Sequence, residues 1–101
     1  MSIIDNIFKI SDSIDDGRTI KDIFAYTIEE VGELATEINI ETGYSKKLPS
    51  EDGILGEAID SIICLVDIIH KTYPDVTSDD IEGICRVKLL KWFSKYTPEK
   101  E

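Results

Sequence analysis

Acidic side chains recur at helical spacing on two segments of this 101-residue chain. The first row comprises Glu30, Glu33 and Glu37, and the second comprises Glu57, Asp60 and Asp67. Residues three, four or seven apart share one face of an α-helix, so each row lies on one face. Hard cations such as Mg²⁺ and Mn²⁺ prefer oxygen ligands, which clustered carboxylates provide. The two rows therefore indicate a divalent metal site held by Glu and Asp.

An acidic row can also be the solvated face of a helix, and for Glu29, Glu37 and Glu41 this interpretation is favoured. Asp60 and Asp67 are different because they interrupt a run of aliphatic residues. A carboxylate in such surroundings is costly to bury unless a cation or a hydrogen-bond donor compensates its charge. We therefore expect both aspartates to have partners.

Basic residues are almost missing from these two segments, which contain only Lys21 and Lys71 at their ends. Without a bound cation, like-charge repulsion would leave some of the converging carboxylates protonated. A Mg²⁺ ion that keeps some of its waters typically meets a phosphate-bearing substrate. The chain has no G-x-x-x-x-G-K-[ST] phosphate loop. We therefore expect metal and lysine to hold the phosphates.

The elements that must position these residues are helices, because apolar residues follow the helical period and no useful stretch alternates with period two. The predicted helices cover residues 2–14, 19–42, 54–72 and 78–96. The first ends before Asp15 and Asp16, and the last ends before Pro98. Thr19 is predicted to cap the second helix, and Ser50 or Asp52 the third. The fold class is therefore all-α, an antiparallel helical bundle of about four helices in a single domain over 1–101.

The third predicted helix is apolar over more than half of its circumference, from Ile54 to Ile69. A helix of this kind must be covered on more than one side. In a chain of this length a second subunit can supply that cover, so oligomerisation is expected to complete the bundle. We predict an obligate homodimer or homotetramer.

Composition excludes several classes of partner. The chain has 21 acidic and 11 basic residues, a formal net charge of -10, which disfavours nucleic acid. No apolar run approaches the roughly 20 residues that span a bilayer, and no basic segment precedes an apolar one at the N-terminus. We expect no membrane partner and a cytoplasmic location. Cys64 and Cys85 are predicted to be buried free thiols, and His70 an ordinary residue at a helix end.

The acidic rows form a recognisable pattern: Glu30-x-x-Glu33, 23 residues, then Glu57-x-x-Asp60. This pattern resembles the E-x-x-E and E-x-x-D motifs of the MazG-like all-α nucleoside triphosphate pyrophosphohydrolases. The neighbouring letters in residues 28–35 and 56–60 are similar to those motifs as well. The resemblance covers about residues 18–96 and is clearest where both motifs occur in order on separate helices.

The resemblance implies hydrolysis of a nucleoside triphosphate between its α and β phosphates, giving a monophosphate and pyrophosphate. It implies that Glu30, Glu33, Glu57 and Asp60 ligate Mg²⁺, for which Mn²⁺ can substitute. One of the glutamates Glu30 and Glu33, or the neighbouring Glu29, would orient or deprotonate the attacking water. A house-cleaning role in the nucleotide pool would follow.

Lysines are the candidates for holding the phosphates: Lys46 and Lys47 in the second connection, and Lys88 and Lys91 on the fourth helix. The family often carries a lysine, asparagine and arginine pattern in its last helix, but here no asparagine follows Lys88.

Other side chains have a structural and a functional interpretation. The aromatic residues of the fourth helix could stack on a base, but core packing is favoured for Trp92, Phe93 and Tyr96, as it is for Phe8 and Phe24. Asp67 is a hypothetical further ligand, or a group that supports the ligands.

Two alternatives stay open at this point. The acidic face could belong to a non-catalytic helical oligomerisation or interaction module, which would show no metal dependence. A third hypothesis keeps the fold and the metal but acts on another phosphoanhydride.

Overall fold

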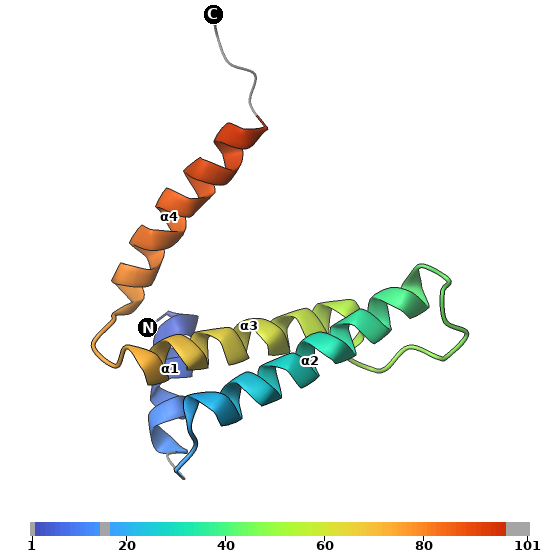
Figure 1. Ribbon diagram of the computed structural model, residues 1–101, viewed down its shortest axis with the longest axis horizontal. Helices are drawn as coiled ribbons and strands as arrows, with labels where there is room; N and C mark the ends of the chain where they lie inside the picture. The colour runs from blue at the N-terminus through green and yellow to red at the C-terminus, as the bar shows by residue number, and fades with distance from the viewer. Residues whose placement is uncertain (1, 15–16, 97–101) are drawn as a thin grey trace, which may run out of the picture.

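The computed structural model describes residues 2–14 and 17–96, and within them it contains four helices and no strand. The helices are α1 (Ile3–Ser13), α2 (Ile20–Glu41), α3 (Gly53–Thr72) and α4 (Ser78–Lys95) (Figure 1). The all-α fold class is confirmed, and each helix boundary lies within one residue of its predicted position. Asp15, Asp16 and Pro98, expected to follow two of the helices, lie outside the described residues.

Local side-chain chemistry explains where the helices begin. Three of them start with a reciprocal capping box, formed by Ser2 with Asp5, Thr19 with Asp22, and Thr77 with Asp80. The start of α3 is different: Asp52 occupies the cap position without a side-chain capping bond. Ser50 instead accepts a hydrogen bond from the backbone N–H of Gly53 at 3.2 Å.

The helices α2 and α3 form an antiparallel hairpin, and α1 packs against α3 (Figure 1). The buried apolar side chains are Ile7 on α1, Ile23 on α2, and Cys64 and Val66 on α3. The buried polar and charged side chains are at least as many, and three of them are the glutamates Glu30, Glu37 and Glu57. The hairpin therefore encloses carboxyl groups as well as aliphatic ones.

Polar contacts fasten α1 to α3. Ser11 donates a hydrogen bond to Asp67 at 2.6 Å, and His70 Nε2 lies 2.7 Å from Asp12 Oδ1. The His70 ring also stacks on Phe8, with 4.3 Å between the ring centroids. The His70 side chain is thus largely buried and holds α1 against α3. His70 was predicted only to be an ordinary residue at a helix end.

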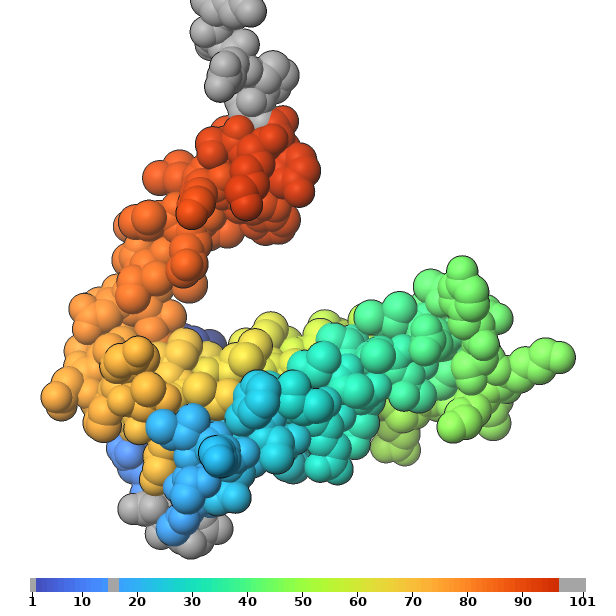
Figure 2. Space-filling view, viewed as in Figure 1, coloured from blue at the N-terminus to red at the C-terminus, as the bar shows by residue number. Residues whose placement is uncertain are grey.

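The helix α4 leads away from the other three (Figure 1), and the space-filling view shows it clear of them beyond its base (Figure 2). Its aromatic residues were predicted to be core, but Trp92, Phe93 and Tyr96 are 61%, 68% and 77% exposed. Cys85 is exposed too, whereas Cys64 is buried as predicted, and both thiols are free. These burial predictions are wrong within one chain because only the first turns of α4 lie beside another helix, α1, and the rest of α4 extends away from the other helices (Figure 1).

Apolar residues are also exposed on the hairpin. Phe24, predicted to be core, is 56% exposed, and on α3 Leu55, Ile62 and Leu65 are exposed as well. A bundle of four helices is therefore not closed within one chain. In the described part of the protein, none of the helices has both the length and the apolar character that crossing a bilayer requires.

Candidate metal centre

The facing sides of α2 and α3 bring five carboxyl groups together in two overlapping sets. Glu30, Glu33 and Glu57 each offer an oxygen atom, and these atoms lie within 4.8 Å of one another. The same limit holds for Asp52, Glu57 and Asp60. All four predicted metal ligands are thus in the sets, and Glu57 belongs to both. We call these five residues the acid cluster.

Helix geometry explains this convergence. Glu30 and Glu33 are about one turn apart on α2, and Glu57 and Asp60 have the same spacing in the first half of α3. Since the two helices run antiparallel, Glu57 meets Glu30 and Glu33 across the hairpin, and Asp60 lies with Glu57 and Asp52.

Asp52 joins the cluster because Gly56, one helical turn later, has no side chain and leaves room for it. A Cβ atom placed on Gly56 would lie 2.5 Å from the Cβ of Asp52, closer than real side chains approach. Only glycine at position 56 therefore lets the Asp52 side chain lie against the first turn of α3. Asp52 was considered only as a helix cap, although its position eight residues, about two helical turns, before Asp60 places the two on one face.

Burial and mutual repulsion make the cluster costly to charge. Glu57 is only 6% exposed, and burial, a hydrogen bond with Glu33 and the charges of Glu33, Glu30 and Asp52 raise its pKa to about 7. Burial also raises the pKa of Glu30, which is 7% exposed. A hydrogen bond from the Tyr26 hydroxyl to Glu30 acts in the opposite direction on Glu30 and raises the pKa of Tyr26.

The cluster offers acceptors that the protein leaves unpaired. Oε2 of Glu57 is buried and has no hydrogen-bond partner among the described residues. The ion pairs found in the described part of the chain do not include any member of the cluster. Buried carboxylate oxygens without donors or basic partners are suited to a hard cation, which needs several oxygen ligands.

Glu29, the third predicted catalytic residue, is exposed on α2 beside the cluster. It belongs to neither set of converging oxygens, but its charge is near enough to contribute to the raised pKa of Glu30. Glu29 is therefore exposed to solvent near Glu30, at the edge of the acid cluster.

Asp67 is not part of the cluster. Its Oδ2 lies 2.7 Å from Nη1 of Arg18, and its Oδ1 accepts the hydrogen bond from Ser11. The hypothesis that Asp67 is a further metal ligand is therefore wrong for this structure. Asp67 was expected to need a partner, and it has one. The partner is Arg18, in the connection before α2, which was not among the predicted partners.

Glu37 was interpreted as part of a solvated face, and this is wrong. It is 5% exposed, and its Oε1 accepts a hydrogen bond from the backbone N–H of Ser50 at 2.7 Å. Glu37 therefore fastens the end of the α2–α3 connection to the hairpin. Glu41, one turn further along, is exposed as predicted.

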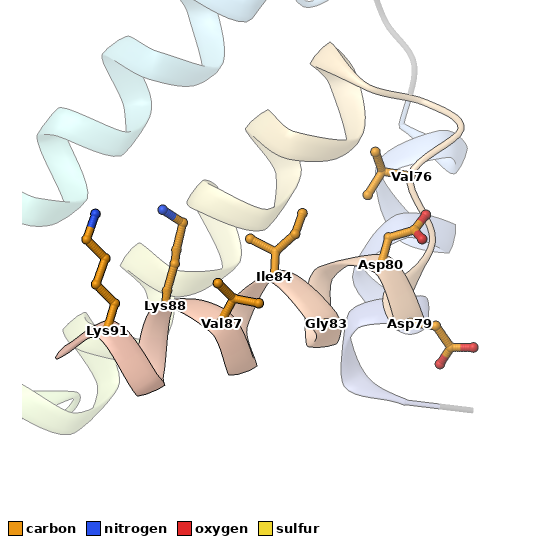
Figure 3. A pocket seen from close by; sticks show the side chains of 8 residues that line it. All are labelled: Val76, Asp79, Asp80, Gly83, Ile84, Val87, Lys88 and Lys91. Atoms are coloured by element: carbon orange, nitrogen blue, oxygen red, sulfur yellow. The ribbon is translucent and has the colours of Figure 1, made fainter. Parts of the chain in front are cut away.

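The four predicted phosphate-binding lysines are not gathered at the cluster within one chain. Lys46 and Lys47 lie in the α2–α3 connection, whereas α4 begins beyond the opposite end of α3 (Figure 1). Lys88 and Lys91 project from the same side of α4 as Ile84 and Val87, and they line an open hollow of about 810 Å³ (Figure 3). Among the described residues, no ion pair joins any of these lysines to the cluster.

Comparison with known proteins finds no matching family model, no matching curated protein and no matching solved structure. The geometry of the acid cluster is therefore the structural observation that points to a function.

Proposed function

We propose that this protein is a Mg²⁺-dependent nucleoside triphosphate pyrophosphohydrolase. It would hydrolyse a ribo- or deoxyribonucleoside triphosphate to the monophosphate and pyrophosphate, serving as a house-cleaning enzyme of the cytoplasmic nucleotide pool. The observation that carries the proposal is the convergence of Glu30, Glu33 and Glu57, and of Asp52, Glu57 and Asp60, on one side of the hairpin.

The residues fit a hard divalent cation. They supply oxygen ligands only, Oε2 of Glu57 is buried without a donor among the described residues, and burial and the neighbouring acids raise the pKa of Glu57 to about 7. Glu30, Glu33, Glu57 and Asp60 would hold Mg²⁺, with Mn²⁺ as a substitute, and Asp52 would complete the set. When bound, the metal would neutralise phosphate charge and lower the pKa of a coordinated water.

The remaining roles fall to side chains at the edge of the cluster. Glu29 is exposed and adjacent to Glu30, so it would orient the attacking water and accept its proton. The Tyr26 hydroxyl lies near Glu30 and lowers its pKa, so it would help to orient that carboxylate. Water would add across the bond between the α and β phosphates.

A second copy of the chain is part of the proposal. The apolar residues left exposed on α3 and α4 need cover, and a homodimer or homotetramer would supply it. The basic stretch of α4, with Arg86, Lys88, Lys91 and Lys95, would then lie against an acidic hairpin. Lys88 and Lys91 would contact phosphates there, and Lys46 and Lys47 would contribute from the α2–α3 connection.

A non-catalytic acidic oligomerisation or interaction module is the second candidate. The observation that favours it is the extent of exposed apolar surface on α4, which would serve assembly whether or not the cluster binds metal. Thermal unfolding with increasing Mg²⁺ separates the two candidates. A metal site raises the midpoint by linkage, whereas a merely acidic surface shows weak screening by salt.

The test of the proposed function is pyrophosphate release from a panel of nucleoside triphosphates with Mg²⁺. The proposal requires release from at least one of them and loss of release when Glu33 is replaced by Gln. Glu41→Gln, at an exposed position on the same helix, is the matched control and should keep its activity.

A further inference from the structure

A cavity of about 320 Å³ lies beyond the acid cluster on the hairpin, and nothing in the proposed chemistry uses it. It is lined by Arg18, Asp22, Ile23, Tyr26 and Asp67, which places it at the end of the hairpin opposite the α2–α3 connection. Its volume is within the range of about 300–1,000 Å³ that small-molecule sites occupy.

Tyr26 joins this cavity to the acid cluster. Its side chain lines the cavity, and its hydroxyl lies near enough to Glu30 to lower the pKa of that carboxyl. Asp22, Tyr26 and Glu30 are four residues apart on α2 and share one face. One helical turn, about 5.4 Å, therefore separates the cavity wall from the nearest carboxylate of the cluster.

The walls suit a flat aromatic group better than a phosphate. Tyr26 offers a ring that is 55% exposed and is the main apolar surface of the cavity, since Ile23, which also lines it, is only 3% exposed. Arg18 is held by its 2.7 Å ion pair with Asp67, so its charge is already compensated and its planar guanidinium is fixed. The carboxylates of Asp22 and Asp67 would repel phosphate oxygens, but they can accept hydrogen bonds from amino or hydroxyl groups.

We propose that this cavity holds the nucleobase of the nucleotide whose phosphates lie at the acid cluster, with the base against the ring of Tyr26. The inference rests on the proposed function and fixes the direction of the substrate along the hairpin. The triphosphate points toward the α2–α3 connection, and the base points toward Arg18.

Calorimetric binding to the full chain with Mg²⁺ tests this assignment, with two kinds of probe. Inorganic pyrophosphate reports on the cluster alone, and a set of nucleoside monophosphates with different bases reports on the cluster and the cavity together. Tyr26→Ala is the test variant. Phe24→Ala is the matched control because Phe24 lies on the same helix, is 56% exposed and does not line the cavity.

We expect Tyr26→Ala to weaken monophosphate binding about tenfold more than pyrophosphate binding, because a stacking ring is lost only for the base. Tyr26→Phe reports separately on the loss of the hydroxyl beside Glu30. Phe24→Ala should change neither, and Tyr26→Phe, which keeps the ring, should retain most of the monophosphate affinity. Circular dichroism of each variant shows whether the fold is kept.

Equal weakening of both probes by Tyr26→Ala would overturn the assignment, because Tyr26 would then act only through Glu30. The assignment is overturned as well if pyrophosphate binds to the wild-type chain but no monophosphate does, or if Tyr26→Ala changes neither. Failure of Mg²⁺-pyrophosphate to bind the wild-type chain at all would instead contradict the proposed function, and this assignment with it.

Discussion

A carboxyl oxygen of Glu33 on α2 and one of Glu57 on α3 lie within 4.8 Å of each other across the hairpin. Two carboxylates this close repel each other unless one is protonated or a cation binds between them. Burial is the largest cause of the raised pKa of Glu57, about 7, and the neighbouring Glu33 comes next. The metal-free hairpin should therefore lose stability as Glu57 ionises.

In the metal-free chain, the free energy of unfolding should fall as the pH rises from about 4.5 to 7. The folded pKa of Glu57 is higher than its ordinary value of 4.5, so the protonated form stabilises the folded state and this contribution is lost as Glu57 ionises. The capping residues Asp22 and Asp80 have lowered pKa values and act only at more acidic pH. Thermal melts in a chelator measure the slope.

Glu57→Gln is the control for this pH dependence. The amide cannot titrate, so the variant should lose most of the fall in stability between pH 4.5 and 7 that the wild-type chain shows. If wild-type and variant melts follow the same pH profile, Glu57 is not the group responsible and the raised pKa is wrong.

Gly56→Ala should weaken Mg²⁺ binding about tenfold, an effect typical of disturbing groups that support a metal site. The new Cβ would lie 2.5 Å from Cβ of Asp52, so the Asp52 carboxylate has to move out of the cluster. Gly32→Ala is the matched control, since nothing lies within 4 Å of its Cβ position, and it should gain about 0.5–1 kcal/mol of helix stability. Unchanged Mg²⁺ affinity in Gly56→Ala would show that Asp52 plays no part.

The sequence was sufficient to predict the four helices and the meeting of Glu30 and Glu33 with Glu57. Both depend on short-range rules: capping boxes and apolar periodicity define the helices, and i, i+3 spacing places the acids on one face. The connection of residues 42–52 lets α2 and α3 pack as antiparallel neighbours. The acidic face of α2 then lies against the acidic face of α3.

What the sequence did not reveal depends on contacts between distant residues. Arg18 lies outside both helices of the hairpin, 49 residues from its partner Asp67. The burial of Glu37 follows from a bond to the backbone of Ser50, which no periodicity records. The exposure of Trp92 reflects the path of α4 after the third connection, and helical spacing on α4 is the same whether the helix packs or not.

Asp67→Asn should lower the free energy of unfolding by about 2 kcal/mol and leave the Mg²⁺ affinity unchanged. The substitution leaves the partly buried Arg18 guanidinium without its 2.7 Å ion pair and disturbs the bond from Ser11. Glu82→Gln is the matched control because it breaks the exposed ion pair with Arg86, at a cost below about 0.5 kcal/mol. A large loss of Mg²⁺ affinity in Asp67→Asn would show that Asp67 contributes to the metal site after all.

Light scattering should give the mass of two or four chains, because the apolar residues exposed on α3 and α4 need a partner. Leu89→Glu, which places a charge on the apolar side of α4, should shift the mass toward one chain. Ser94→Glu introduces the same charge at an exposed polar position and should leave the assembly intact. A wild-type mass of one chain would contradict the proposed assembly.

Pyrophosphate release by wild-type and Asp60→Asn chains shows whether the acid cluster catalyses Mg²⁺-dependent hydrolysis of a nucleoside triphosphate. We expect wild-type chains with Mg²⁺ to release pyrophosphate from at least one nucleoside triphosphate and to stop when a chelator is added. Asp60→Asn should reduce the rate by about 100-fold or more while its helicity is unchanged. Full activity in Asp60→Asn, or no pyrophosphate from any triphosphate in the panel, would contradict catalysis by the acid cluster.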